Sequence, residues 1–365
     1  MKIADLVQFL ESIAHPSLQE QYDNAGLITG NVSWECRGII CALDCTEAVI
    51  QEAISKKCNC IVAHHPIIFG GLQKINGKNY VEQVVIAAIK NDIAIYAIHT
   101  NLDNVAEGVN GKIASKLGLH NLAVLSPRSH SLQKLFTFVP VDHAEKVRNA
   151  IFKAGGGQIG NYSECSFNAT GTGTFKPGAG TEPFVGKTGE RHEENEIKIE
   201  VIFPSFLTTP VLAALRASHP YEEVAYDLVP LSNEHPGIGS GLIGTLPMPV
   251  EEHRFLTGIK EVFKVPVIRH TALLNKPVQK VAVCGGAGSF LISRALAAGA
   301  DAYITSDMKY HEFFDANGRM LIADVGHYES EQFTIELLQE VLGQKFPTFA
   351  VLKTEVETNP VHYFK

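Results

Sequence analysis

The chain has 365 residues, 45% of them hydrophobic, so it is long enough for two or three domains with a sizeable core. Its formal net charge is −8 and its basic residues form no block, which argues against a dedicated nucleic-acid surface but leaves a local patch possible. No apolar run approaches the roughly 20 residues of a membrane span, and the amphipathic N-terminus does not resemble a secretory signal. We therefore expect a cytoplasmic protein with no membrane partner.

The first 100 residues alternate between apolar runs and amphipathic segments. The runs at 38–43, 58–63 and 92–98 predict buried strands, and the intervening segments 46–57 and 80–91 have helical spacing. Strand, helix and strand in succession are typical of parallel crossover units. This first part of the chain is therefore predicted to form an α/β lobe.

Two adjacent histidines follow the second of these strands. Successive side chains of a strand point to opposite faces, so His64 and His65 cannot share one core layer while the chain stays extended. Pro66 restricts His65 to extended conformations, and we expect the strand to end here with both imidazoles at its carboxyl edge. The next strand is followed by His99 and Asp103. Polar groups thus reach the edge at which open α/β sheets bind ligands.

The pattern changes near residue 135. Strand, helix, a Gly/Thr/Ser-rich stretch, strand, helix and strand follow, which gives the order β-α-β-β-α-β of a ferredoxin-like unit of about 100 residues. The α/β alternation then resumes after a Gly/Pro-rich link at 231–244, so we interpret this unit as an insertion. The predicted domains are a first α/β lobe (1–128), an inserted ferredoxin-like α+β domain (129–233) and a second α/β lobe (234–365).

The second lobe repeats the alternation of predicted strands and helices seen in the first lobe. Strands are predicted at 280–288, 300–307 and 320–327, and the last of them ends in His327. Glu331 lies four residues later at the start of a predicted helix, so the two side chains share a face if that first turn is helical. Two similar lobes on either side of an insert are the fold that this sequence predicts.

The strand ends together supply three imidazoles and two carboxylates: His64, His65, Asp103, His327 and Glu331. This set of nitrogen and oxygen donors is enough for a two-metal site, and it suits zinc, iron or manganese better than copper or magnesium. Each residue alone is more often a solvated or hydrogen-bonded surface group, so the prediction depends on their joint placement. The pattern alone leaves a metal site and its absence equally open.

Two further histidines are candidates for proton transfer. His99 lies four residues before Asp103 and could orient a ligand or act as an acid or base. His311, in a helix predicted at 309–318, would approach the same edge if the lobes pair, although it could instead cap that helix. The glycines at 285–289 could bind phosphate through their backbone N–H groups, but they match neither GxGxxG nor a P-loop.

Several motifs carry a resemblance to a known family. AHHPIIF (63–69), HTNLD (99–103), GGAGS (285–289), SDMKYHEFFDA (306–316) and DVGHYESE (324–331) occur in the order found in the NIF-three-like dinuclear metal centre proteins, and DNAGL (23–27) fits as well. Many members are named GTP cyclohydrolase I type 2 homologues. The insert is similar to that of the longer members, which resembles PII and CutA proteins, most clearly at 219–231.

The resemblance implies a site and an assembly. It makes His64, His65, Asp103, His327 and Glu331 the ligands of two divalent metal ions, with the Glu331 carboxylate bridging them. It also implies a ring-shaped homohexamer whose metal sites face an internal cavity.

Two functions follow from these observations. The first is a metal-dependent hydrolase that acts on a purine nucleotide, in which paired ions activate a water and His99 or His311 moves protons. Its specific form, opening of the GTP imidazole ring with loss of formate, is implied by the resemblance alone. The second is a non-catalytic, metal-stabilised hexameric ring that encloses nucleic acid or a partner protein and whose insert binds a regulator or gates the cavity.

Overall fold

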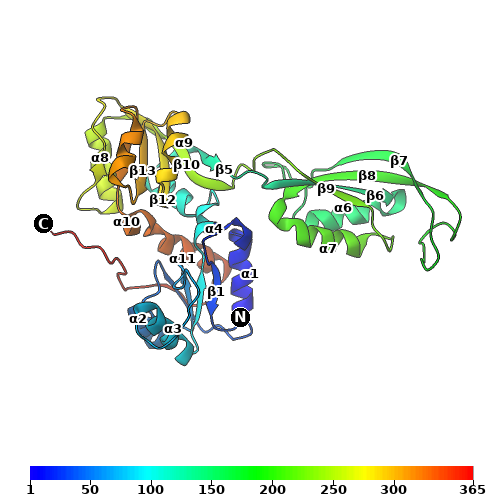
Figure 1. Cartoon of the computed structure of the whole chain (residues 1–365), viewed down its shortest axis with the longest axis horizontal. Helices are drawn as coiled ribbons and strands as arrows, with labels where there is room; N and C mark the ends of the chain where they lie inside the picture. The colour runs from blue at the N-terminus through cyan, green and yellow to red at the C-terminus, as the bar shows by residue number, and fades with distance from the viewer. Residues whose placement is uncertain (365) are drawn as a thin grey trace. The chain divides into compact units, whose positions relative to one another are not determined.

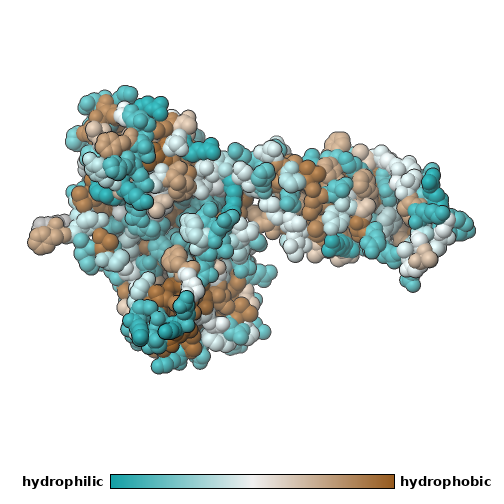
Figure 2. Space-filling model, viewed as in Figure 1, coloured by the Kyte–Doolittle hydropathy of each residue, from teal (hydrophilic) through white to brown (hydrophobic). Residues whose placement is uncertain are grey.

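The computed structural model describes residues 1–364, which form two compact units (Figure 1). Unit 1 comprises Met1–Pro127 and Gly237–Lys365, and unit 2 comprises Arg128–Pro236. Strands and helices alternate along unit 1, and the predicted α/β class is confirmed. Within the described residues no helix combines the length and apolar character needed to cross a bilayer. On the face seen in Figure 2, hydrophilic residues cover much of each unit, with smaller hydrophobic patches between them.

The first sheet of unit 1 has the strand order β1-β4-β3-β2-β15. Its strands are β1 (Gly26–Thr29), β2 (Ile39–Ala42), β3 (Cys60–Ala63), β4 (Ala94–Ala97) and β15 (Val351–Lys353). All neighbours are parallel except β1, which runs antiparallel to β4. Every residue of β2, β3 and β4 is buried, because α1 (Ile3–Ile13) and α11 (Phe333–Lys345) pack on one face and α2 (Glu47–Ser55) and α3 (Tyr80–Lys90) pack on the other.

The second sheet has the order β11-β14-β13-β12-β10-β5. Its strands are β5 (His120–Pro127), β10 (Gly239–Val250), β11 (Arg269–His270), β12 (Val278–Ala287), β13 (Ala302–Ser306) and β14 (Leu321–Asp324). The three central strands β12, β13 and β14 are parallel, and the others pair antiparallel. Helix α8 (Glu252–Phe263) packs on one face, and α9 (Ile292–Ala297) packs on the other.

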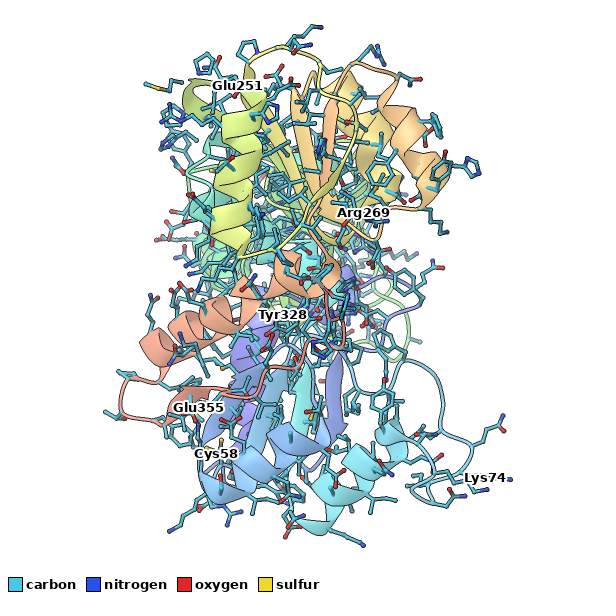
Figure 3. All side chains as sticks on the ribbon, turned by 90° about the vertical axis from the view of Figure 1, so that its left-hand side faces the viewer. Cys58, Lys74, Glu251, Arg269, Tyr328 and Glu355 are labelled. Atoms are coloured by element: carbon cyan, nitrogen blue, oxygen red, sulfur yellow. The ribbon has the colours of Figure 1, made fainter. Side chains whose placement is uncertain are left out.

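Each half of the chain contributes a strand to the sheet of the other half, and the two sheets have a common core. Strand β5 precedes the insert in sequence but lies in the second sheet, and the C-terminal β15 lies in the first. One hydrophobic cluster contains residues of both sheets, for example Val62 and Tyr96 of the first and Val283 and Ile304 of the second. In Figure 3 the sheets lie above and below α11 and α10 (His327–Glu331). Each sheet also has a hydrophobic cluster of its own on its other face, and the shared cluster joins the two sheets into one compact unit.

Three predicted element boundaries are wrong. The stretch 231–244, expected to be a link, contains the start of β10, whose Leu242 pairs with β12 on one side and β5 on the other. The strand expected to reach His327 ends at Asp324, because Gly326 takes a φ of 93°, and His327 is instead the first residue of α10. The helix expected at 309–318 is a short 3-10 helix, η5 (Tyr310–Ala316).

Unit 2 contains one antiparallel sheet of order β7-β8-β6-β9. Its elements in chain order are β6 (Leu132–Pro140), α6 (Ala144–Lys153), β7 (Phe167–Phe175), β8 (His192–Pro204), α7 (Thr208–Ser218) and β9 (Tyr226–Pro230). The two helices pack their apolar faces on one side of the sheet, where alternate residues such as Leu135 and Val201 are buried. The residues between them, including Phe136 and Lys198, lie on the opposite, helix-free face.

Candidate metal centre

Both sheets of unit 1 direct the carboxyl ends of their parallel strands toward one region, where the chemically competent residues gather. The first sheet contributes residues that follow β2, β3 and β4, and the second sheet contributes residues that follow β13 and β14. The former are Asp44, His64, His65, His99 and Asp103, and the latter are Asp307, His327 and Glu331. The pairing of two sheets thus brings together residues more than 260 positions apart in the sequence.

The adjacent histidines lie where the sequence predicted them. The backbone N–H of His64 donates to Ala42 at 3.1 Å and that of His65 donates to Leu43 at 2.9 Å, so β3 keeps its pairing with the β2 chain up to Pro66. The two rings nevertheless stay close, with centroids 4.9 Å apart. His64 is fully buried.

Glu331 lies at the centre of the cluster. Its Oε2 is 2.9 Å from Nε2 of His65 and 3.2 Å from Nε2 of His327, and those two nitrogens are 3.4 Å apart. Its Oε1 is 3.8 Å from Nε2 of His64, which in turn is 3.6 Å from Oδ1 of Asp103. Two groups of potential ligands result: His65, His327 and Glu331 form one, and His64, Asp103 and Glu331 form the other. Glu331 belongs to both and turns a different oxygen toward each.

The glycine turn after β12 makes room for this carboxylate. Gly286 has a φ of 65°, and a Cβ atom added there would overlap Oε1 of Glu331. Its N–H donates to Oγ of Ser330 at 3.0 Å, which fixes the turn against α10. The glycines that suggested a phosphate loop therefore border the Glu331 side chain.

Each imidazole of the cluster donates a hydrogen bond from Nδ1 to a carboxylate or carbonyl oxygen. Nδ1 of His65 donates to Asp44 and Nδ1 of His327 donates to Asp307, both at 2.7 Å. Nδ1 of His99 donates to Asp23 at 2.8 Å, and Nδ1 of His64 donates to the carbonyl of Ile98 at 2.8 Å. This is the arrangement that fixes the tautomer of a metal-binding histidine and leaves Nε2 to the ion.

The supporting carboxylates were not identified as such from the sequence. Asp44 and Thr46 are both cap-type residues before α2; Thr46 caps the helix, and Asp44 faces His65. Asp23 looked like a turn former, and it also accepts hydrogen bonds from Thr100. The usable signal for Asp44 was its position directly beyond a buried strand, which His64 shares.

The protonation of the cluster shows how strongly it attracts positive charge. Burial disfavours the charged ring of His65, but its hydrogen bonds to Asp44 and Glu331 outweigh burial and raise its pKa to about 9. Burial likewise opposes charge on His327, yet Asp307 and Glu331 raise its pKa to about 11. Burial alone would raise the pKa of Glu331, and the surrounding histidines reverse this and lower it well below the usual value.

The donor set fits divalent cations. Among buried polar atoms of the described residues, Nε2 of His64 and Oδ1 of Asp103 have no hydrogen-bond partner, although each is well placed to bind an ion. Burial and the charge of Glu331 raise the pKa of Asp103 well above its usual value, as expected for two neighbouring buried carboxylates. Imidazole nitrogens mixed with carboxylate oxygens suit zinc, iron and manganese.

The two predicted proton-transfer residues differ in position. The ring of His99 lies 5.2 Å from that of His64 and 5.3 Å from that of His65, and these three residues form a further group that could hold a metal ion. His311 is exposed on η5, where its ring contacts Tyr310 and Phe314, and it is not among the residues that line the cavity. The structure brings His99 to the centre and leaves His311 outside it.

The cluster opens into a cavity of about 1070 Å³. Its wall includes the partly exposed rings of Phe69, Tyr80 and Phe290. Figure 3 labels Arg269, on strand β11 of the second sheet, and Tyr328, on α10, which both line the cavity. Arg269 is the one lysine or arginine among the lining residues within the described chain, and it forms an ion pair with Asp324. The wall is therefore aromatic and acidic, with little positive charge.

Replacement of Asp44 by Asn is expected to lower metal affinity about 10- to 100-fold, because a neutral amide holds the His65 ring less firmly and supports a bound cation less well. Competition against a chromophoric chelator measures this change. Asp92→Asn is the matched control, since Asp92 is exposed and its φ of 51° is one that Asn tolerates. Equal affinities of Asp44→Asn and the wild type would contradict the supporting role of Asp44.

Known proteins share both the sequence and the fold. Residues 1–360 match the sequence profile of the Duf34/NIF3 (NGG1p interacting factor 3) family. The chain belongs to the Duf34/NIF3 family. A Duf34/NIF3 relative from Halalkalibacterium halodurans, named GTP cyclohydrolase 1 type 2 homolog, is 42% identical over 368 residues and covers 99% of each chain.

Solved structures with the same fold support the family assignment. A Bacillus cereus protein described as related to NIF3 superposes with a TM-score of 0.87 at 38% identity, covering 100% of this chain and 99% of that one. Staphylococcus aureus protein SA1388 superposes with a TM-score of 0.79 at 29% identity, with the same coverage. The family membership inferred from the motifs is therefore confirmed over the whole fold.

Proposed function

We propose that the protein is a hydrolase that depends on two divalent metal ions, zinc, iron or manganese, and that acts on a purine nucleotide. The observation that supports it most is the position of Glu331, whose two carboxylate oxygens each face one histidine-containing group. Glu331, His65 and His327 would hold one cation, and Glu331, His64 and Asp103 would hold the other. The name of the relatives, GTP cyclohydrolase 1 type 2 homolog, makes GTP the first substrate to test.

Two bound ions would supply Lewis acidity and lower the pKa of a water at the site. The chain itself contributes a residue for proton transfer. Burial opposes ionisation of Asp23, but hydrogen bonds from His99 and Thr100 prevail and lower its pKa to about 2. The ionised Asp23 keeps the proton of His99 on Nδ1 and leaves Nε2 able to accept a proton.

The cavity wall favours a substrate with a planar ring. Phe69, Tyr80 and Phe290 are 54%, 67% and 64% exposed, respectively, and offer ring faces on which a base can stack. Arg269 is the one lysine or arginine in the described cavity wall that could pair with a phosphate group. The base is therefore expected to contribute more to recognition by side chains than the phosphates do.

The test is turnover by the intact, metal-loaded protein. GTP, other nucleotides, nucleosides and phosphoesters are each incubated with the protein, and products are separated and identified. The control is His64→Ala, which removes one nitrogen donor and leaves the cavity wall in place. Turnover that is lost in His64→Ala supports the proposal, whereas no turnover of any compound above this control would contradict it and favour a non-catalytic role of the metal site.

The proposal also covers the fold of unit 2 and the oligomeric state of the protein. The order β-α-β-β-α-β and the antiparallel sheet β7-β8-β6-β9 support a ferredoxin-like, PII/CutA-like unit 2. The ring-shaped homohexamer stays a prediction, which light scattering of the purified protein tests directly.

A further inference from the structure

Unit 2 has a cavity of its own, of about 670 Å³, on the helix-free face of its sheet. The floor is formed by β7 and β8, and residues 177–184 and 221–225 form the rim. Every lining residue belongs to unit 2, so this cavity is separate from the metal centre. Its volume lies within the range of small-molecule sites, about 300 to 1,000 Å³.

Glycines create the hollow in the sheet. Gly171 and Gly173 of β7 lie on the helix-free face, and Gly171 is directly opposite Glu196 of β8. A Cβ atom added at Gly171 would meet no atom within 4 Å, so this position faces open space. A Cβ atom at Gly173 would overlap the carboxylate of Glu196. The absence of side chains on β7 thus leaves room for both the carboxylate and a ligand beside it.

Glu196 is an acidic group without a counter-ion. It is 7% exposed, and Oε1 accepts a hydrogen bond from the hydroxyl of Tyr221 at 3.0 Å. Among the residues that the structure describes, no lysine, arginine or histidine lies within 4.0 Å of its carboxylate. A buried carboxylate that lacks a cation is costly unless a ligand supplies one.

The walls beside Glu196 are aromatic. The ring of Tyr221 lies 5.8 Å from that of Phe175 and 6.3 Å from that of Phe184, and all three line the cavity together with Phe138. Burial and the neighbouring Glu196 raise the pKa of Tyr221, so its ring stays neutral. Aromatic faces around a carboxylate are the surroundings that bind ammonium groups, by charge pairing and by cation–π attraction.

The other charges of the cavity are consistent with a cationic ligand. Glu222 and Glu223 lie at the rim. Lys198 also lines the cavity, but its Nζ is paired with Glu200 at 2.8 Å and lies 4.5 Å from the centroid of the Phe136 ring. Lys176 is exposed at the rim. None of the three glutamates of the cavity has an ion-pair partner among the described residues, and Glu196 is the buried one of the three.

We propose that this cavity binds an organic cation, a molecule that carries a protonated amine or a quaternary ammonium group on an apolar or aromatic body. The ammonium group pairs with Oε2 of Glu196, and the body lies against Phe175, Phe184 and Tyr221 in the space above Gly171. The inference does not depend on the activity of the metal centre.

The experiment compares two probes of nearly the same shape on the full-length protein. Titration calorimetry measures binding of 2-phenylethylamine, which is positively charged at neutral pH, and of 2-phenylethanol, which is neutral. We expect the amine to bind about 10-fold more tightly or better, because a hydrogen bond between charged partners replaces a neutral one. Glu196→Gln should remove this preference, while Glu193→Gln, an exposed position on the same strand, should retain it.

Gly171→Leu gives an independent steric test that keeps the carboxylate. The added side chain enters the open space and should abolish binding of both probes, and thermal unfolding verifies that each variant is folded. The proposal is overturned if both probes bind equally to the wild type, if neither binds at millimolar concentration, or if Glu196→Gln keeps the preference. Unchanged amine binding by folded Gly171→Leu would overturn it as well.

Discussion

Replacement of Glu331 by Gln is expected to reduce the metal content of the purified protein from about two ions per chain to near zero. Gln keeps the shape of the side chain but removes the negative charge that both histidine-containing groups share. An amide is a much weaker ligand than a carboxylate, and here it would replace a ligand of both sites. The loss of affinity should exceed the about 10- to 100-fold expected for a supporting residue such as Asp44.

Elemental analysis of dialysed protein measures this result. Glu340→Gln is the control, because Glu340 is a partly exposed residue of α11 that pairs with Lys112 and has no role at the centre. A near-UV circular dichroism spectrum shows whether the core of unit 1 is intact. Retention of both ions by a folded Glu331→Gln protein would show that the ions bind elsewhere.

Removal of the metal is expected to destabilise unit 1 and leave unit 2 unchanged. An ion at 100 times its dissociation constant stabilises the folded state by about 2.7 kcal/mol, which corresponds to a fall in Tm of about 5 to 10 °C for a body of this size. The ligands that lose their cation belong to unit 1, whereas unit 2 has a separate core around Phe203 and Val211. Differential scanning calorimetry with and without a chelator resolves the two transitions.

The unit 2 transition serves as the internal control of that experiment. Addition of zinc or manganese after the chelator is removed should restore the higher Tm of unit 1. A shift of both transitions by the same amount would indicate a general effect of the chelator, and the absence of any shift would contradict a stabilising metal centre.

Local signals in the sequence were sufficient to place the histidines near the carboxyl edge of the first sheet, although the pattern alone left a metal site and its absence equally open. Buried strands at 58–63 and 92–98 are recognisable as apolar runs, and polar residues directly beyond them must lie at the carboxyl edge of a parallel sheet. His64, His65 and Asp103 follow from this reasoning. The His327 and Glu331 pair follows from helical spacing, although His327 lies in the helix and not at the end of the strand.

Features that depend on distant parts of the chain could not be predicted. Strand β15 has three residues and gains its structure from pairing with β2, so nothing in its own sequence identifies its sheet. The contact between Asp44 and His65 likewise depends on the packing of neighbouring strands. His311 shows the converse, because a histidine in a conspicuous motif was expected at the centre and is exposed among aromatic residues of its own segment.

The exchange of strands between the two sheets has a consequence for how the protein is made. When the ribosome has synthesised β1 to β4, the edge of β2 still lacks its partner β15, which begins at residue 351. Strand β5 likewise emerges before β10, its only partner among the described strands. The contacts that complete unit 1 are thus far apart in the sequence, and such contacts form slowly.

Unit 2 is continuous in sequence, so it can fold while the second half of unit 1 is still being synthesised. The first half of unit 1 must meanwhile keep the edge of β2 from pairing with other chains. Glu331 also emerges late, so metal can enter its complete ligand set only after nearly the whole chain has left the ribosome. If the centre binds metal as proposed, we expect metal capture to be a late step that reports on completed folding of unit 1.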